Sequence, residues 1–193
     1  AGNDVTAQFT VKTENGNLVI NPRAVTLKSA NLNKEYDGTA LVNGETALAK
    51  EEGWAEGEGA TYEFTGSQTV VGTSANAFSY NLKDGTKAGN YTISKTEGTL
   101  TVKDRATKYE ITVKAKSDTT TYTGKEHKVE GFKETEFTVD GNKYTVEGLK
   151  ASGAAGTDAG KYTSKVTGTA VVKDAAGNDV TAQFTVKTEN GNL

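Results

Sequence analysis

TEFTVDGNKYTV, residues 135–146, contains two runs in which apolar and polar side chains alternate. Phe137 and Val139 lie before its centre, and Tyr144 and Val146 lie after it. A period of two is typical of a β-strand with one buried face. Between the runs, the sequence Asp-Gly-Asn at 140–142 supplies residue types that adopt the positive φ angles of a tight turn. The stretch therefore predicts a β-hairpin.

The same alternation recurs along most of the chain, in short runs separated by turns that contain glycine. Glycine is frequent, with 22 residues, whereas proline occurs once, which suits many short strands joined by tight turns. No helical crossover is indicated between the runs, so the pattern predicts an all-β fold of antiparallel sandwiches rather than a parallel sheet. Further runs contain Val25 and Leu27, Tyr62 and Phe64, Phe78 and Tyr80, Ile111 and Val113, and Phe184 and Val186.

Residues 1–18, AGNDVTAQFTVKTENGNL, are repeated without change at residues 176–193. A perfect repeat of this length indicates one period of a tandem array. We therefore expect the chain to be a piece of a longer protein, in which residues 1–20 are the terminal strands of a preceding repeat. If the two identical copies compete for one position in a sheet, the N-terminal copy is expected either to pair outside its own fold or to insert into the second module of a neighbouring molecule.

A second and weaker repeat divides this period into two modules. AVTLK at 24–28 is matched by EITVK at 110–114, and NYTISKTEGTL at 90–100 is matched by QFTVKTENGNL at 183–193. The latter pair predicts a terminal hairpin closed by a glycine turn. We expect two tandem Ig-like antiparallel β-sandwich modules, at residues 21–104 and 105–193. Their short seams predict an elongated, semi-rigid rod.

Several motifs of the two modules resemble the MBG/YDG-type repeats of large bacterial surface adhesins. They are KEYDGT at 34–39, GWAEG at 53–57, GSQTVVGTSAN at 66–76, AGNY at 88–91, AGTDAGKY at 155–162 and TAVVKDAAGNDVT at 169–181. The resemblance implies Ig-like repeats of an exported bacterial protein, with no shared catalytic residues and no shared ligand. The second module departs from the pattern, with Tyr122-Thr123-Gly124 in place of Tyr-Asp-Gly and no GWAEG segment. We therefore expect the middle loops of the two modules to differ.

Composition argues against several function classes. The chain has no cysteine, so it has no disulfide or thiolate chemistry. Its net charge of −3 comes from interspersed charges, and no run of apolar residues reaches the length of a membrane span. Its single histidine, His127, lies in a charged stretch, and no Gly-x-Ser-x-Gly motif is present. We expect no enzyme activity, no cofactor, and no contact of this chain with nucleic acid or membrane.

Three other kinds of site are weaker candidates. The segment 174–179, DAAGND, has acidic residues but not the glycine and glutamate positions of a calcium loop, so a β-turn is favoured. A Lys–Asn cross-link would need Lys28, Lys114 or Lys116 in the core, whereas the alternation places their side chains in water. Trp54, the only tryptophan, lies in EEGWAEGEG at 51–59. Its ring either contacts a ligand or folds back over the core of the first module.

The predicted function is a structural stalk or display repeat of a bacterial cell-surface adhesin-like protein, located outside the cell. The alternative is an adhesin module that contacts a host glycan or matrix protein through loops 51–59 and 66–76, with Trp54 as the candidate contact. The expected partners are neighbouring repeats of the same protein. In isolation we expect a monomer, or strand-exchanged chains formed through residues 1–18.

Overall fold

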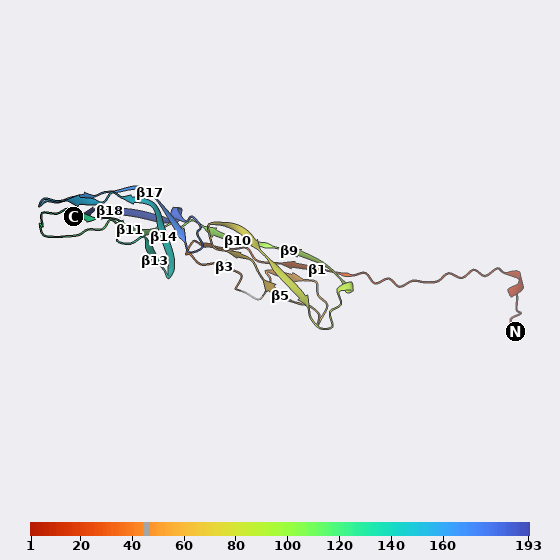
Figure 1. The fold of residues 1–193 in the computed structure, drawn as a ribbon. Helices are drawn as coiled ribbons and strands as arrows, with labels where there is room; N and C mark the ends of the chain where they lie inside the picture. The colour runs from red at the N-terminus through yellow and green to blue at the C-terminus, as the bar shows by residue number, and fades with distance from the viewer. Residues whose placement is uncertain (45–46) are drawn as a thin grey trace.

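The computed structural model describes residues 1–44 and 47–193. This part of the chain consists of short β-strands and three 3-10 helices, which confirms the all-β prediction. The molecule is elongated: two groups of strands lie end to end, and an extended N-terminal tail continues along the same direction (Figure 1). Among the described residues, no helix is both long enough and apolar enough to cross a membrane.

Strands β1 to β10 pair only with one another among the described residues, and we call them the first strand group. They form the sheets β4-β1-β9 and β2-β10-β7 and the pairs β3-β6 and β5-β8. Their bounds are β1 Arg23–Lys28, β2 Leu32–Glu35, β3 Leu41–Val42, β4 Lys50–Glu52, β5 Ala60–Phe64, β6 Ser67–Gln68, β7 Gly72–Asn76, β8 Phe78–Leu82, β9 Tyr91–Thr96 and β10 Gly98–Lys103, with the 3-10 helix η2 Ala88–Asn90 before β9.

Strands β11 to β19 form the second strand group, which again pairs only within itself in the described chain. Its sheet β13-β14-β17 is accompanied by the pairs β11-β18, β12-β15 and β16-β19. Their bounds are β11 Tyr109–Lys114, β12 His127–Val129, β13 Glu136–Val139, β14 Asn142–Ala151, β15 Ala154–Gly156, β16 Thr163–Ser164, β17 Val166–Asp174, β18 Phe184–Glu189 and β19 Gly191–Asn192, with η3 Thr181–Gln183 before β18.

The hairpin predicted within TEFTVDGNKYTV is confirmed. Strand β13 pairs with β14 in antiparallel register, and Val139 faces Asn142 across the turn. The two turn residues, Asp140 and Gly141, have φ angles of 48° and 81°. Positive φ at both central residues gives the turn a backbone twist that matches the twist of the two strands. The sequence pattern therefore located this hairpin correctly.

The prediction of antiparallel pairing throughout is wrong. Strand β1 runs parallel to β9, β2 runs parallel to β10, and β11 runs parallel to β18. Each parallel pair joins an early strand of a group to one of its last strands. A long connection can bring parallel strands together, whereas the turn signals in a sequence report only on strands that are adjacent in the chain.

The terminal hairpin predicted for residues 90–100 is also not formed. Strand β9 belongs to the sheet of β1, whereas β10 belongs to the sheet of β2 and β7, so the chain changes sheets at Gly98. The Ser29 hydroxyl accepts a hydrogen bond from the Gly98 amide at 2.8 Å and donates one to the carbonyl of Asn76 at 2.6 Å. A Cβ atom on Gly98 would collide with the carbonyl oxygen of Ala30. Gly191 makes the same change of sheet in the second group, where a Cβ would collide with the carbonyl of Lys116.

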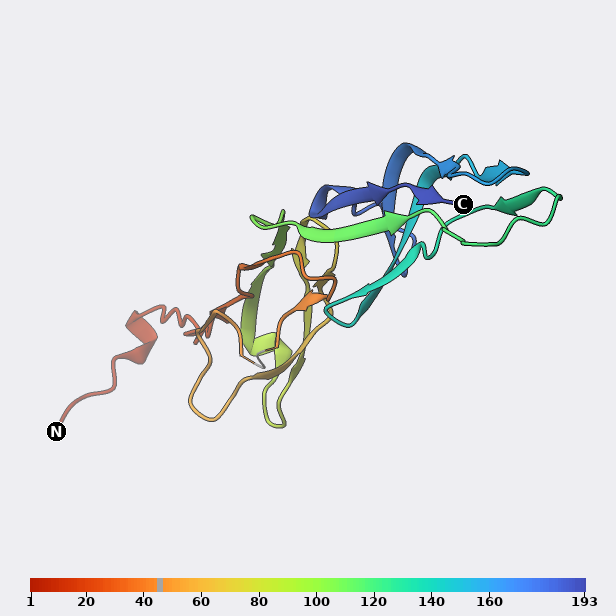
Figure 2. The same cartoon turned by 90° about the vertical axis from the view of Figure 1, so that its left-hand side faces the viewer.

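The buried apolar residues form two clusters. One lies inside the first group and contains Val25, Leu27, Phe78 and Tyr91. The other is centred on Val113, Tyr144 and Val172 of the second group, and it also includes Tyr36 and Val102 of the first. The second cluster therefore extends across the junction between the groups. Figure 2 shows the two strand groups meeting at this junction.

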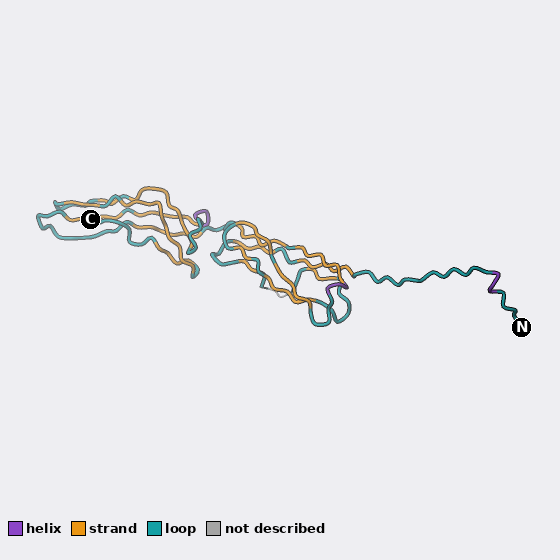
Figure 3. Tube along the Cα trace, turned by 45° about the vertical axis from the view of Figure 1, so that its right-hand side comes forward, coloured by secondary structure: helices purple, strands orange, loops and turns teal. Residues whose placement is uncertain are grey.

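The two identical eighteen-residue segments adopt different structures. Residues 1–22, all of which the structure describes, are exposed and form no strand, whereas residues 184–189 form β18 (Figure 3). Phe9 is 67% exposed, and its counterpart Phe184 is 5% exposed. The 3-10 helix η1 (Thr6–Gln8) nevertheless forms in the tail, as η3 does in the second group. The assignment of residues 1–20 to a preceding repeat stays a prediction.

Candidate functional site

The most extensively built polar and aromatic arrangement in the described chain is the junction between the two strand groups. Its centre is the turn after β2, at Tyr36, Asp37 and Gly38. Tyr36 is 1% exposed, and its hydroxyl lies 3.4 Å from the hydroxyl of Tyr144 in β14. Gly38 has a φ of 80°, and a Cβ there would collide with the Tyr144 hydroxyl. The first group thus presents a glycine turn that fits closely against the second.

Arg105 ties the junction together from the segment that connects the groups. One of its terminal nitrogens, Nη1, donates to the carbonyl of Tyr36 at 2.8 Å and to the hydroxyl of Tyr109 at 3.0 Å. The guanidinium also stacks over the Tyr109 ring, with its Cζ atom 3.8 Å from the ring centroid. A planar guanidinium can make both kinds of contact at once, and a lysine ammonium cannot reproduce this combination.

Two side-chain amides complete the junction. Asn142 at the start of β14 donates to the carbonyl of Asp37 at 3.0 Å. Gln183 is buried; its Oε1 accepts from the amide of Arg105 at 2.9 Å and its Nε2 donates to Asp104 at 2.6 Å. These bonds bind both the turn and the connecting segment to the second group, so buried polar groups at the junction have partners.

The tyrosines at the junction hold their protons tightly. Burial raises the pKa of Tyr36, and its contact with Tyr144 adds to the effect. Burial and a hydrogen bond to Asp140 raise the pKa of Tyr109 to about 12. The Tyr109 hydroxyl donates to Asp140 at 2.8 Å while it accepts from Arg105. These groups are therefore neutral hydrogen-bonding partners near neutral pH.

Trp54, the candidate ligand contact, lies in the first group, away from the junction. Its ring packs edge-on against Tyr91, with 4.8 Å between the centroids, and contacts the core cluster of that group. Its indole nitrogen is buried near Tyr62 but makes no hydrogen bond in the described chain. The Tyr91 hydroxyl accepts from the Ala55 amide and donates to Glu58, which holds loop 51–59 against the ring. A ligand role for Trp54 stays a prediction.

The predicted loop 66–76 is largely strand. It contains β6 and β7, and β7 pairs along its length with β10. Its small residues Thr, Ser and Ala suggested a loop by composition, but their burial alternates as in a half-buried strand. Only the segment between Gln68 and Gly72 is available as a loop.

The remaining sequence candidates are separated from one another. His127 lies at the start of β12, with Nε2 2.8 Å from the Thr123 hydroxyl. Asp174 accepts hydrogen bonds from the amides of Ala176 and Asn178, so its carboxylate closes a turn of its own backbone. Lys114 is exposed and pairs with Glu189 at 2.7 Å. Within residues 1–44 and 47–193, no three His, Cys, Asp or Glu side chains gather as a metal site would require.

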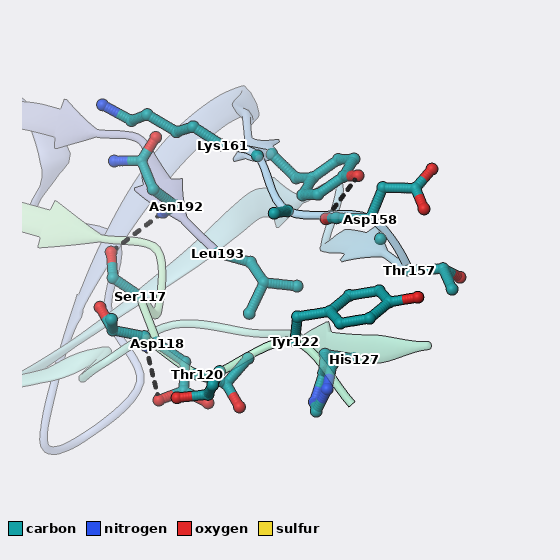
Figure 4. Close-up of a pocket in the computed structure, with 16 residues that line it drawn as sticks. Ser117, Asp118, Thr120, Tyr122, His127, Thr157, Asp158, Lys161, Asn192 and Leu193 are labelled. Atoms are coloured by element: carbon teal, nitrogen blue, oxygen red, sulfur yellow. Dashed lines mark hydrogen bonds between the residues drawn. The ribbon is translucent and has the colours of Figure 1, made fainter. Parts of the chain in front are cut away.

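A groove of about 510 Å³ lies at the end of the second group that is far from the junction. One wall is formed by residues 117–122 and the other by residues 156–162, and Leu193 lies between them (Figure 4). The exposed ring of Tyr122 stands at the opening, near His127. Sequence inspection did not find this groove, because its two walls are far apart in the chain.

Comparison of the chain with protein-family models, with curated proteins and with solved structures gave no match in any of the three.

The junction residues could not be identified from the sequence either. The sequence did not single out Arg105, and it marked Asn142 only as a turn residue. The available signal was the Tyr-Asp-Gly motif, which the sequence pattern marked as a turn but not as a contact surface.

Proposed function

We propose that the chain is a structural stalk or display segment of a bacterial cell-surface adhesin-like protein. In this proposal it consists of two Ig-like modules of the MBG/YDG type, at residues 21–104 and 105–193, arranged as a semi-rigid rod outside the cell. The two strand groups supply the modules. Neighbouring repeats of the same protein are the partners that matter most to such a segment.

The observation that carries the proposal is the shared core at the junction. Tyr36 and Val102 come from the first group but belong to the same buried cluster as Tyr144 and Val172 of the second. A flexible tether would leave such side chains exposed, whereas a buried contact resists bending because any hinge motion exposes apolar surface. A segment that transmits orientation from one module to the next is what a stalk requires.

The ligand-binding alternative has less support from the geometry. It assigned the contact to Trp54 and to loops 51–59 and 66–76, but the Trp54 ring is packed against Tyr91 and much of 66–76 is strand. Within 66–76 only the segment between Gln68 and Gly72 remains as a loop, and a binding site of useful affinity needs convergent apolar and polar groups. Repetition of a weak site could still add avidity.

Small-angle X-ray scattering tests the rod. The wild-type chain is expected to scatter as one extended particle, and a variant with Gly-Ser-Gly inserted after Asp104 is expected to sample many inter-module angles and give a broader distance distribution. Identical, compact profiles for the two proteins would refute the rod.

Binding to glycan arrays, mucin and matrix proteins tests the alternative. The stalk proposal expects no binding by the wild-type chain. Binding that is lost in Trp54→Ala, but kept in Trp54→Phe, would establish the adhesin alternative instead.

A further inference from the structure

The last strands of the two groups, β10 and β19, have equivalent neighbours. The structure around β10 can therefore be used to identify the residues expected around β19. The Thr99 amide donates to Asn31 at 2.9 Å, and the Asn192 amide donates to Ser117 at 3.0 Å. Gly98 faces Asn76 across one pair of strands, and Gly191 faces Ser164 across the other. Leu193 therefore corresponds to Leu100, and residues 118–122 correspond to residues 32–36.

In the first group, residues 101–103 fill the position that is an open groove in the second. They continue β10 between two neighbours, pairing in parallel with β2 and antiparallel with β7. Val102 is 1% exposed at this position. The Tyr36 amide then donates to the carbonyl of Lys103 at 2.9 Å. Three residues of strand thus satisfy the backbone on both sides and bury an apolar side chain.

In the second group, both walls of the groove have unpaired backbone. Within the described chain, Thr120, Thr121 and Tyr122 make no backbone hydrogen bond, and neither does Lys161 on the opposite wall. Tyr122 is 64% exposed, although its counterpart Tyr36 is buried. Figure 2 shows the two arms, in green and light blue, extending past the C-terminus, and the groove lies between them. Unpaired backbone on either side of a groove, with Leu193 between its walls, is a template for an added strand.

The chain itself contains the segment that fits. Residues 1–18 are identical to residues 176–193, so the residues that follow Leu18 align with the part of the groove next to Leu193. The sequence GNLVIN at 16–21 aligns with GTLTVK in β10, and Ile20 takes the place of Val102. In the tail, Ile20 is 84% exposed, and Val19 is also exposed. An apolar, β-branched segment is therefore available in extended chain, without a partner of its own.

We propose that residues 19–21 of a second copy of this chain enter the groove as a strand, between residues 119–121 and residues 160–161. Ile20 is then buried as Val102 is, and the carbonyl of Asn21 accepts from the Tyr122 amide. The contact joins the tail of one molecule to the far end of another, so it is heterologous and builds head-to-tail chains. The inference adds a contact between copies to the proposed structural role, and it rests on that role. Its test measures molecular mass rather than shape or ligand binding, so either proposal can fail alone.

The test is sedimentation velocity over a range of protein concentrations, with a matched pair of tail variants. Wild type is expected to associate as concentration rises. Ile20→Asp places a charge in the groove and is expected to weaken association at least about tenfold. Phe9→Asp, the control, is expected to associate as wild type does. Both side chains are exposed in the single molecule, so neither variant disturbs its fold.

Strand exchange through residues 1–18 gives the opposite pattern. Exchange would bury Phe9 in the place of Phe184, so Phe9→Asp would abolish it, as would deletion of residues 1–17. Groove docking survives both changes. A wild-type chain that is monomeric at all concentrations, or an Ile20→Asp variant that associates as wild type does, would overturn the proposal.

A variant whose own C-terminal extension fills the groove provides a second test of association. Addition of Val-Ile-Asn after Leu193 is expected to occupy the groove in cis and keep the protein monomeric. Addition of Gly-Ser-Gly at the same place is expected to leave association intact, because it brings no apolar side chain. Equal association of the two extended proteins would show that the groove is not the docking site.

Discussion

Replacement of Tyr36 by alanine is expected to uncouple the two strand groups. The side chain belongs to the first group in sequence, yet it packs in the buried cluster of the second. Tyr122 occupies the corresponding position of the second group, before a glycine turn, and is exposed. The two substitutions therefore remove the same side chain from the same local structure, with and without a neighbouring group packed against it.

The expected cost follows from burial. Truncation of a fully buried aromatic side chain to alanine costs about 3–5 kcal/mol, because transfer free energy and the resulting cavity both contribute. Tyr36 also loses its contact with the Tyr144 hydroxyl. Tyr122→Ala lies on the surface and is expected to change stability by no more than about 0.5 kcal/mol. The difference between the variants measures the contribution of the junction.

Urea denaturation followed by two probes gives the measurement. Trp54 is the only tryptophan and packs in the core of the first group, so its fluorescence reports that group alone. Far-ultraviolet circular dichroism reports both groups. We expect the two transitions to coincide in wild type and in Tyr122→Ala, and to separate in Tyr36→Ala. Equal stabilities for the two variants would refute a shared core at the junction.

Three further outcomes are expected. Gly98→Ala forces a Cβ against the Ala30 carbonyl and is expected to lower the free energy of unfolding by at least about 2 kcal/mol in urea titrations. A Cβ on Gly89 would contact no neighbouring atom, so Gly89→Ala should change the free energy of unfolding little. Equal effects of the two substitutions would contradict the crowding at Gly98. Because the folded pKa of Tyr109 is raised to about 12, its contribution to stability is complete below its ordinary pKa of 10.0 and is lost as pH rises from there to about 12. Unfolding free energies measured across this window should fall less steeply in Tyr109→Phe than in wild type; parallel slopes would contradict the assignment. Acrylamide should quench Trp54 weakly in the folded protein and strongly in urea, whereas strong quenching before unfolding would contradict its packing against Tyr91.

The features that could be predicted from the sequence are local ones. Alternation located most strands, and Asp140-Gly141 located the hairpin, because side-chain period and turn conformation depend on residues within a few positions. The parallel partners β1 and β9 could not be predicted, since the contact that selects them spans most of a strand group. The change of sheet at Gly98 was missed for the same reason.

The junction shows the same limit more sharply. Tyr36 and Tyr122 lie in similar local sequences, but one is buried and the other exposed. The difference comes from the neighbouring group and not from the residues around either tyrosine. The duplicated segment leads to the same conclusion. Its Thr-Ala-Gln turn forms in both copies, whereas the following strand forms only in the C-terminal copy, where β11 pairs with it as β18. Local hydrogen bonds suffice for the turn, and the strand requires a partner.

Parallel pairing of the first strand with a late strand decides how each group responds to tension. A pull applied at Arg23 and Lys103 draws β1 and the β9–β10 segment in opposite directions along their common axis. The backbone bonds between β1 and β9 lie across that direction, so the pull shears the whole ladder at once and cannot open it one bond at a time. The pair β11–β18 loads the second group in the same way. Each group should therefore extend in a single abrupt step in a force-spectroscopy experiment, and a gradual opening would contradict this geometry.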